Sequence, residues 1–362
     1  MAAKNQVTIS QVAREAGVST QTVSRVINDR PDVAPDTRRR VKEAVARLGY
    51  RPNALARGLS QQRSHTIGVV AVAWEYYAPM RFLVGIEQQI RAMGYNLLLD
   101  LLHHPDTENV DQILYRLLSN QVDGIIWAVP EIGNNRSWLD AAAVNQPVPV
   151  VFLSMQSQPA AIDISIDNRE GGRMATGHLV SQGYQHIGLI CGPTDWWEAR
   201  QRRLGWQEAL QAYKLEAGSN QVVEGNWSAS SGQDGLLRLL EQFPEMDAVF
   251  AGNDQMALGV LQAAHTLGLR VPEDLGVVGF DNIPESAYYW PALSTVNQPL
   301  LELGWTAVKE LSKLVEAYHK DEPVEECQSI LLKPGLIVRS SSTREPVPGK
   351  SILLARPMNQ GQ

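Results

Sequence analysis

Two sets of polar side chains in this sequence could take part in chemistry, and the first lies near its start. Thr20, Gln21, Ser24 and Arg25 fall on one side of a predicted short helix whose other side is apolar. Hydroxyl, amide and guanidinium groups on such a face can bond to base edges when the helix enters the major groove. An ordinary helical hairpin has similar spacing, so the pattern alone leaves both interpretations open.

The charge distribution favours a nucleic-acid partner for this end of the chain. Residues 1–64 hold 12 Lys and Arg against 5 Asp and Glu, a net charge of +7. The whole chain of 362 residues has a net charge of −7, so the remainder carries −14. A basic head on an acidic body fits the binding of a polyanion at one end only.

The second set of side chains follows predicted strands in the remainder of the chain. Aromatic faces stack on the CH groups of a pyranose, and Arg, Asp, Asn and Gln pair with its hydroxyls. Asp281 is the strongest candidate, because a carboxylate directly after an apolar strand must be solvated, paired or ligand-bound. Trp206 is expected in the core, and Asp254 is expected to cap a helix, which leaves Asn253 freer to face a ligand. The other candidates are Trp196, Arg202, Asn226, Trp227, Asn282, Asn297 and Gln298.

The elements that position the first set are two short helices joined by a turn. Thr8 and Gln11 have capping-box spacing at the start of the first helix, and Gly17 supplies the positive φ that ends it. Ser19 can cap the second helix. This layout predicts a helix-turn-helix whose second helix is the reading element.

A third helix is predicted within residues 34–49, followed by a helical turn or two from Asn53 to Leu59. Thr37 and the three arginines after it are placed for DNA phosphates, with a solvated basic face as the alternative; we expect one or two phosphate contacts. Leu59 fits either linker packing or a wedge between base steps of the minor groove.

From His65 onward, short apolar segments alternate with amphipathic helical ones. This pattern predicts parallel doubly wound sheets, which bind ligands at the carboxyl ends of their strands. Strands are predicted at 67–72, 96–101, 124–127, 150–153, 186–191, 248–250 and 276–279. Helices are predicted near 79–93, 107–120, 169–182, 198–213, 254–267 and 300–319.

Composition excludes several classes of protein. With 44% hydrophobic residues the chain can bury a large core. No apolar run is as long as a membrane span, and no apolar signal region is found near the start, so neither membrane insertion nor export is predicted. Two cysteines, Cys191 and Cys327, make neither a disulfide framework nor a metal site. We find no nucleotide-binding glycine fingerprint, metal-ligand spacing or nucleophile elbow, which argues against an enzyme. The basic head and the missing export signal argue against a transport receptor. We therefore expect a cytoplasmic, nucleoid-associated protein without cofactor or metal.

The sequence resembles the lactose/galactose repressor (LacI/GalR) family over nearly its whole length, to about Arg339. The motifs that carry the resemblance are V-A-x-x-A-G-V-S-x-x-T-V-S-R-V-I-N, T-R-x-x-V, L-G-Y-x-P-N-x-x-A-R-x-L and I-G-V-V. The resemblance implies a helix-turn-helix head and an α/β body of two doubly wound parallel-sheet lobes, similar to periplasmic binding proteins.

By this resemblance, Thr20, Gln21 and Arg25 read bases, and Leu59 is the hinge leucine that opens the operator centre. The resemblance, together with the basic third helix, assigns DNA phosphates to Thr8, Ser19, Thr22, Asn28, Thr37 and Arg38. Two residues depart from the family. Ala34 replaces a capping serine, and Gly58 lies inside the hinge helix, which it should weaken by up to ~1 kcal/mol relative to Ala.

The resemblance also implies three chain crossings between the lobes, which we place near Ser165, Ser294 and Pro323. The expected domains are a head (1–51), a hinge and linker (52–65), a body (66–340) and a flexible tail (341–362). Within the body, the N-terminal lobe takes residues 66–164 and 294–323, and the C-terminal lobe takes residues 165–293 and 324–340.

In the family the effector lies between the lobes. Arg202, Asn253 and Asp281 match effector-binding positions, as do Trp227 and Gln298 more loosely, and Trp74, Tyr76, Phe82 and Ala128 occupy lining positions of the N-terminal lobe. Tyr76, Ala128 and Ser154 differ from the lactose repressor, and the larger aromatic surface favours a glycoside such as a disaccharide.

The function expected from these features is repression of sugar-utilisation genes by a homodimer bound to a near-palindromic operator. A mono- or disaccharide would close the cleft and release the operator. Two alternatives remain open: a corepressor, as in the purine-responsive branch of the family, or a partner protein, as in catabolite control.

Overall fold

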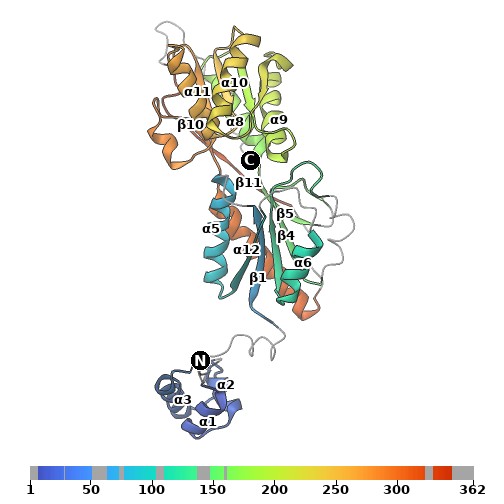
Figure 1. Cartoon of the computed structure of the whole chain (residues 1–362), viewed down its shortest axis with the longest axis vertical. Helices are drawn as coiled ribbons and strands as arrows, with labels where there is room; N and C mark the ends of the chain where they lie inside the picture. Colours follow the sequence, from blue (N-terminus) through green and yellow to red (C-terminus); the bar gives the residue numbers. More distant parts are fainter. Residues whose placement is uncertain are drawn as a thin grey trace, which may run out of the picture. The chain divides into compact units, whose positions relative to one another are not determined.

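The computed structural model describes residues 7–27, 29–50, 63–72, 77–102, 110–136, 147–158, 161–322 and 329–344 (Figure 1). The chain divides into two compact units, Met1–Thr66 and Ile67–Gln362. We call them the head and the body. In the described part of the chain, no helix is both long and apolar enough to cross a membrane.

The head consists of three helices around one small core. They are α1 (Ile9–Ala16), α2 (Thr20–Ile27) and α3 (Pro35–Leu48). Val12, Val23 and Val41 are fully buried where the three helices meet. Helices of 8 to 14 residues are marginal alone in water, so this shared core is what stabilises them.

The predicted helix ends of the head are confirmed. The Thr8 hydroxyl accepts from the Gln11 amide at 3.4 Å, while the Gln11 side chain accepts from the Thr8 amide at 2.8 Å. Gly17 ends α1 in the left-handed conformation, with φ of 64°. The Ser19 hydroxyl accepts from the Thr22 amide at 3.1 Å. These local bonds set the turn that places α2.

The helix α3 begins without a side-chain cap, because Ala34 stands at its N-cap position. We expect Ala34→Ser to stabilise the head by about 1 kcal/mol, since its hydroxyl can accept an amide hydrogen of the first turn. Hydrogen exchange of the α3 peptide in the full chain should slow about fivefold. Ser19→Ala, which removes the cap of α2, should have the opposite effect there, and unchanged exchange in both variants would contradict the capping argument.

The body contains two six-stranded sheets, each covered by helices on both faces (Figure 1). The first sheet has the order β11-β5-β4-β3-β1-β2 and forms the N-terminal lobe. Its strands are β1 (Thr66–Val72), β2 (Asn96–Leu102), β3 (Gly124–Ala128), β4 (Val150–Leu153), β5 (Ile162–Ile166) and β11 (Ile330–Leu332). Its helices are α5 (Tyr77–Ala92), α6 (Val110–Ser119) and α12 (Leu300–Lys320).

The second sheet, with the order β12-β10-β9-β8-β6-β7, forms the C-terminal lobe. Its strands are β6 (Ile187–Cys191), β7 (Val222–Glu224), β8 (Ala248–Ala251), β9 (Gly276–Asp281), β10 (Ser294–Asn297) and β12 (Gly335–Ile337). Its helices are α8 (Asn168–Ser181), α9 (Trp197–Ala212), α10 (Ala229–Gln242) and α11 (Asp254–Thr266), with short turns η2 (Ser219–Gln221) and η3 (Pro284–Tyr288). Only the β10–β12 pair is antiparallel among the described strand pairs.

Two of the three predicted crossings need correction. The first follows β5, near the predicted position. The second follows β10, because Ser294–Asn297 pairs with β9 in the C-terminal lobe. The third lies between β11 and β12, at residues 333–334 rather than near Pro323, because β11 pairs with β5 of the N-terminal lobe. Strands of three residues have too little periodicity to be recognised from sequence.

The body also extends beyond the predicted boundary at residue 340. The backbone oxygen of Ser341 accepts from the Val277 amide at 2.9 Å, and its hydroxyl donates to the Val277 carbonyl at 2.7 Å. Ser341 and Ser342 are fully buried. The predicted tail therefore begins later, and residues 345–362 lie outside the described residues.

The helix α10 was absent from the predicted elements. Its glycines interrupt the apolar pattern, and the structure shows why they are there. A Cβ atom at Gly232 would lie 2.0 Å from the Met256 carbonyl oxygen, so the close approach of α10 to α11 requires glycine.

Candidate functional site

The predicted base readers lie on the exposed side of α2. Thr20, Gln21 and Arg25 are exposed, while Val23 and Val26 on the opposite side are buried. The Arg25 guanidinium lies 3.4 Å from Asp32 and remains 51% exposed. An exposed ion pair of this kind is worth about 0–1 kcal/mol, so DNA can displace it.

The residues predicted to contact DNA phosphates differ in their exposure. Thr8 and Ser19 are exposed, and Thr22 and Thr37 are half-buried. Arg38 has an internal role, because it donates to Asp29 Oδ1 at 2.5 Å and to the Arg30 carbonyl, which holds the α2–α3 loop. Asn28 and Leu59 lie outside the described residues.

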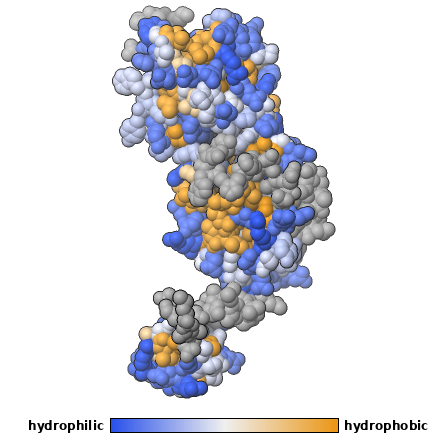
Figure 2. All heavy atoms as spheres, viewed as in Figure 1, coloured by the Kyte–Doolittle hydropathy of each residue, from blue (hydrophilic) through white to orange (hydrophobic). Residues whose placement is uncertain are grey.

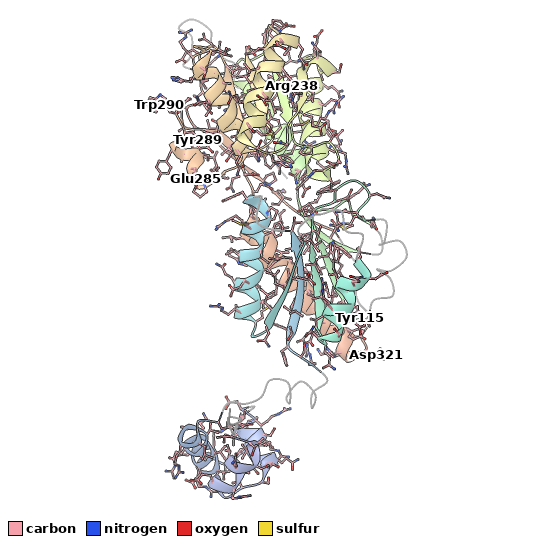
Figure 3. All side chains as sticks on the ribbon, viewed as in Figure 1. Tyr115, Arg238, Glu285, Tyr289, Trp290 and Asp321 are labelled. Atoms are coloured by element: carbon pink, nitrogen blue, oxygen red, sulfur yellow. The ribbon has the colours of Figure 1, made fainter. Side chains whose placement is uncertain are left out.

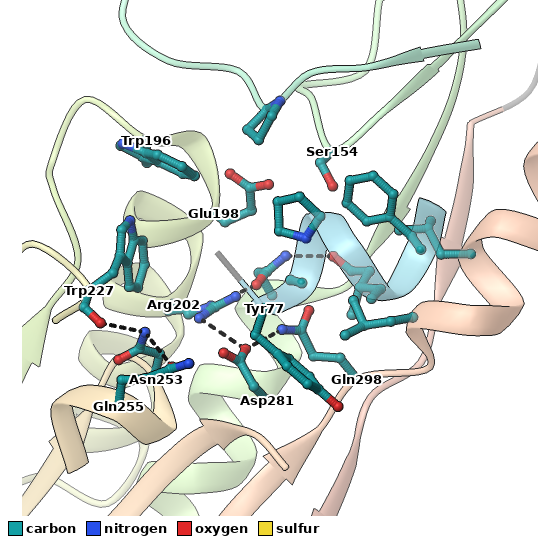
Figure 4. A pocket seen from close by; sticks show the side chains of 18 of the residues that line it. Tyr77, Ser154, Trp196, Glu198, Arg202, Trp227, Asn253, Gln255, Asp281 and Gln298 are labelled. Carbon is teal, nitrogen blue, oxygen red and sulfur yellow. Dashed lines mark hydrogen bonds and ion pairs between the residues drawn. The ribbon is translucent and has the colours of Figure 1, made fainter. Parts of the chain in front are cut away.

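In the body, a cavity of about 370 Å³ lies where the two lobes meet (Figure 4). Eight predicted candidates line it: Phe82, Trp196, Arg202, Asn226, Trp227, Asn253, Asp281 and Gln298. Asn282 and Asn297 are not among the lining residues, and the Asn282 side-chain amide donates to Asn297 Oδ1 at 3.0 Å. Trp74 and Tyr76 lie outside the described residues. Ala128 is a correction, since it is fully buried in the core of the N-terminal lobe and is not among the lining residues.

The polar centre of the cavity is a buried ion pair between Arg202 of α9 and Asp281 at the end of β9. Arg202 Nη1 lies 3.8 Å from Asp281 Oδ1, which also accepts from Gln298 Nε2 at 2.5 Å. Burial raises the pKa of the Asp281 carboxyl to about 6, although Arg202 and Gln298 act to lower it.

Arg202 is held rigidly by its neighbours. Its Nε donates to Asn168 Oδ1 at 2.8 Å, and its Nη1 donates to the Gly252 carbonyl at 2.5 Å. The guanidinium carbon lies 3.8 Å from the ring centroid of Phe280 and 5.4 Å from that of Trp227. The fixed charge is therefore presented to a ligand without further ordering cost.

The predicted cap of α11 needs correction, because Asn253 rather than Asp254 caps this helix. Asn253 caps α11, because its Oδ1 accepts from the Met256 amide at 2.8 Å, and it also lines the cavity. Asp254 is fully buried beneath the cavity and accepts from the Ile283 amide at 2.8 Å and from Thr295 Oγ1 at 2.6 Å. Burial and Asp281 raise the pKa of the Asp254 carboxyl to about 8.

Two indole rings form the aromatic wall of the cavity. Trp196 and Trp227 pack edge to face, with ring centroids 5.7 Å apart and planes at 73°. Trp206 is buried in the core, as predicted, and is not among the lining residues.

Sequence reasoning missed several lining residues, among them Tyr77, Asn168, Glu198 and Gln255. Tyr77 is adjacent to the predicted residue Tyr76, and Gln255 comes two residues after Asn253, so their positions in the sequence could have indicated both. Asn168 follows β5, which the apolar pattern did not reveal. Glu198 lies between the predicted residues Trp196 and Arg202, but nothing in its spacing singles it out.

A clasp connects the lobes at one side of the cavity. It joins residues 131–133, which follow β3, to residues 195–197 at the start of α9. The Trp197 amide donates to the Glu131 carbonyl at 2.9 Å, and the Gly133 amide donates to the Asp195 carbonyl at 2.8 Å. Arg200 adds an ion pair to Glu131 at 3.1 Å. The clasp stabilises the arrangement in which both lobes line the cavity.

We expect Arg200→Ala to weaken effector binding two- to fivefold, because it removes the charged part of this clasp from a half-exposed site. Calorimetric titration of the full chain would measure the change. Arg203→Ala, an exposed neighbour on the same helix, should bind as the parent does; equal losses in both variants would show that the effect is not specific to the clasp.

Comparison with known proteins decides the family. Residues 8–53 match the family described as bacterial regulatory proteins, lacI family, and residues 176–342 match the periplasmic binding protein-like domain. The HTH-type transcriptional repressor PurR of Haemophilus influenzae is 36% identical over 336 residues, covering 92% of this chain and 98% of that protein. The chain belongs to the lacI family of bacterial regulatory proteins.

Other members of this family resemble the chain in sequence and in structure. The lactose operon repressor of Escherichia coli is 34% identical over 308 residues, covering 85% of this chain and 84% of that protein. The lac repressor dimer bound to operator and the anti-inducer ONPF superposes with a TM-score of 0.83 at 33% identity, covering 94% and 100% of the two chains. The complex of the regulator CelR with cellobiose has a TM-score of 0.67 at 30% identity, covering 92% and 99%.

As a lacI-family protein, the chain is a DNA-binding transcriptional repressor and not an enzyme. The predicted architecture of a helix-turn-helix head and two parallel α/β lobes is confirmed.

Proposed function

We propose that this repressor controls sugar-utilisation genes as a homodimer and leaves a near-palindromic operator when a mono- or disaccharide occupies the cavity. The observation that carries the proposal is the pairing of an indole wall with the Arg202–Asp281–Gln298 centre, which offers both a stacking face and hydroxyl partners. The resemblance to the CelR–cellobiose complex supports a ligand of disaccharide class.

The coupling between effector and operator would use the two lobes as a switch. The cavity has Phe82 of α5 on its N-terminal-lobe side and Arg202 and Asp281 on its C-terminal-lobe side. A ligand that touches both sides binds the closed arrangement more tightly and shifts the population toward it. By the family resemblance, the resulting movement of the N-terminal lobes would separate the paired hinge helices expected within residues 52–65, of which residues 52–62 lie outside the described residues, and operator affinity would fall.

Exposed apolar side chains support the proposed homodimer. Trp290 and Tyr288, which follow β9 in the C-terminal lobe, are 95% and 89% exposed, and Met80 and Val84 are exposed on α5. Figure 3 shows Trp290 pointing away from the body, and Figure 2 shows apolar atoms gathered on the face of the N-terminal lobe that carries α5. Aromatic surface of this kind is typical of protein interfaces.

Replacing Trp290 with aspartate should therefore give a monomer. A monomer engages one half-site, so operator affinity should fall at least about 100-fold. Sedimentation and gel-shift titration measure both effects. Tyr115→Asp changes an exposed aromatic residue on α6 and serves as the control. A Trp290→Asp protein that remains dimeric would contradict the proposed interface.

The function is tested by screening the full chain against sugars by thermal shift, then titrating operator with and without each ligand that binds. A ligand at 100 times its dissociation constant should stabilise the protein by about 2.7 kcal/mol. A stabilising sugar that weakens operator binding supports the proposal, and the absence of any sugar ligand overturns it.

A second candidate is a small-molecule corepressor or a partner protein that raises operator affinity instead of lowering it. The 36% identity to catabolite control protein A of Priestia megaterium, over 93% of this chain, supports this second candidate. In that case operator affinity would rise with ligand, so the same titration separates the two candidates.

A further inference from the structure

Glu198, in the first turn of α9, lines the cavity but has no role in the recognition described above. Its Oε2 atom is buried and has no hydrogen-bond partner among the described residues. Ser154, from the opposite lobe, lines the cavity beside the same carboxyl group (Figure 4). A buried acceptor that lacks a donor costs free energy, which a ligand with a donor in that place would recover.

Several charged groups face Glu198. Arg202 lies one turn later on α9, Glu131 lies on the clasp, and Arg136 follows the clasp. Arg136 is only partly paired: its Nη2 donates to the Val129 carbonyl and its guanidinium lies 5.9 Å from the Phe152 ring, whereas its Nε and Nη1 are buried without a hydrogen-bond partner among the described residues. Arg136 is not among the lining residues of the cavity. Burial, helped by Glu131, raises the pKa of the Glu198 carboxyl to about 7, while its own backbone amide, Arg202 and Ser154 act to lower it.

The charge balance of the cavity disfavours an anionic ligand. Among the described lining residues, Arg202 is the single cation, and Glu198 and Asp281 are the carboxylates. The Arg202 charge is already compensated by Asp281 at 3.8 Å and held by Asn168 and Gly252. A phosphate or carboxylate on the ligand would therefore lie near the buried Glu198 carboxyl, and no lining cation would be free to pair with it.

Building on the proposed function, we propose that the effector is an uncharged glycoside, that one of its hydroxyls donates to Glu198 Oε2, and that sugar phosphates and uronic acids are rejected. Glu198 is thus a specificity-determining residue. Because a hydroxyl donor favours the ionised carboxylate, effector affinity should rise with pH as the free carboxyl ionises, between about pH 6 and 8.

The test is calorimetric titration of the full chain with lactose, maltose and cellobiose, with the 6-phosphate of each, and with the matching 6-amino-6-deoxy sugar. Glu198→Gln removes the charge at constant shape, and Glu241→Gln makes the same change at an exposed site on α10. Loss of a charge-assisted hydrogen bond should weaken the neutral ligand about 10- to 150-fold in Glu198→Gln and leave Glu241→Gln unchanged. The rise in affinity from pH 6 to 8 should become smaller in Glu198→Gln but not in Glu241→Gln, and the part that remains would come from Asp281 and Asp254, which titrate in the same range.

Each result has a distinct meaning. Tighter binding of a 6-phosphate than of its parent sugar would overturn the inference while leaving a sugar effector in place. Equal affinity of the parent protein and Glu198→Gln for the neutral ligand would remove the role of Glu198. Tighter binding of the amino sugar would overturn the hydroxyl assignment. Failure of every sugar to bind would overturn the proposed function itself.

Discussion

Arg202→Met should produce a repressor that still binds its operator but no longer responds to effector. Arg202 contributes the fixed cation of the cavity, so effector affinity should fall at least about 100-fold. Operator binding should persist, because the head forms its own core of α1, α2 and α3. Gel-shift titration with and without effector would measure both properties.

The same substitution should lower the stability of the body. It leaves Asp281 buried without its cation, and breaking such a pair costs about 3–5 kcal/mol, or a melting temperature about 10 °C lower. Asp281 already has a raised pKa in the folded state, so the folded protein favours its protonated form. The stability deficit should therefore shrink as pH falls from 8 toward 5, where the carboxyl becomes neutral.

The double variant Arg202→Met/Asp281→Asn provides the control. Removal of both charges should recover much of the melting temperature without restoring the effector response. If the Arg202→Met variant still responded to effector, the proposal that the effector binds at this ion pair would be wrong. A deficit that does not change with pH would show that lost packing, rather than the stranded carboxylate, is the cause.

Arg25→Ala should abolish most of the preference for operator over random DNA. Arg25 is exposed on α2, and the loss of a base contact costs about 1–3 kcal/mol, or 5- to 150-fold, for each half-site. Arg39→Ala is the matched control, because Arg39 is an exposed arginine on α3 paired with Asp36 and Glu43. It should weaken binding to operator and random DNA about equally.

Gel-shift titrations at several salt concentrations separate the two variants. Arg39→Ala removes about one phosphate contact, so the slope of log affinity against log salt concentration should become shallower by about 0.9. Arg25→Ala should instead change the ratio of specific to non-specific affinity. Unchanged operator preference in Arg25→Ala would contradict its assignment as a base reader.

The sequence by itself determined the head and the sites where strands end. Thr8, Gly17 and Ser19 act through residues three or four positions away, so their caps could be predicted without the fold. Asp281 was recognisable because it follows an apolar strand, and parallel sheets bring such ends to one edge.

Tertiary structure decided which side chains meet. Asn253, rather than Asp254, caps α11, because Thr295 and the Ile283 amide satisfy the Asp254 carboxylate from distant parts of the chain. The Glu131 clasp and the unpartnered oxygen of Glu198 likewise depend on tertiary structure. Each lobe is built from segments that lie far apart in the sequence, and the two lobes must meet before these contacts exist. Sequence periodicity reports local geometry, whereas burial and charge pairing depend on contacts between residues tens to hundreds of positions apart, and these arise only when the chain folds.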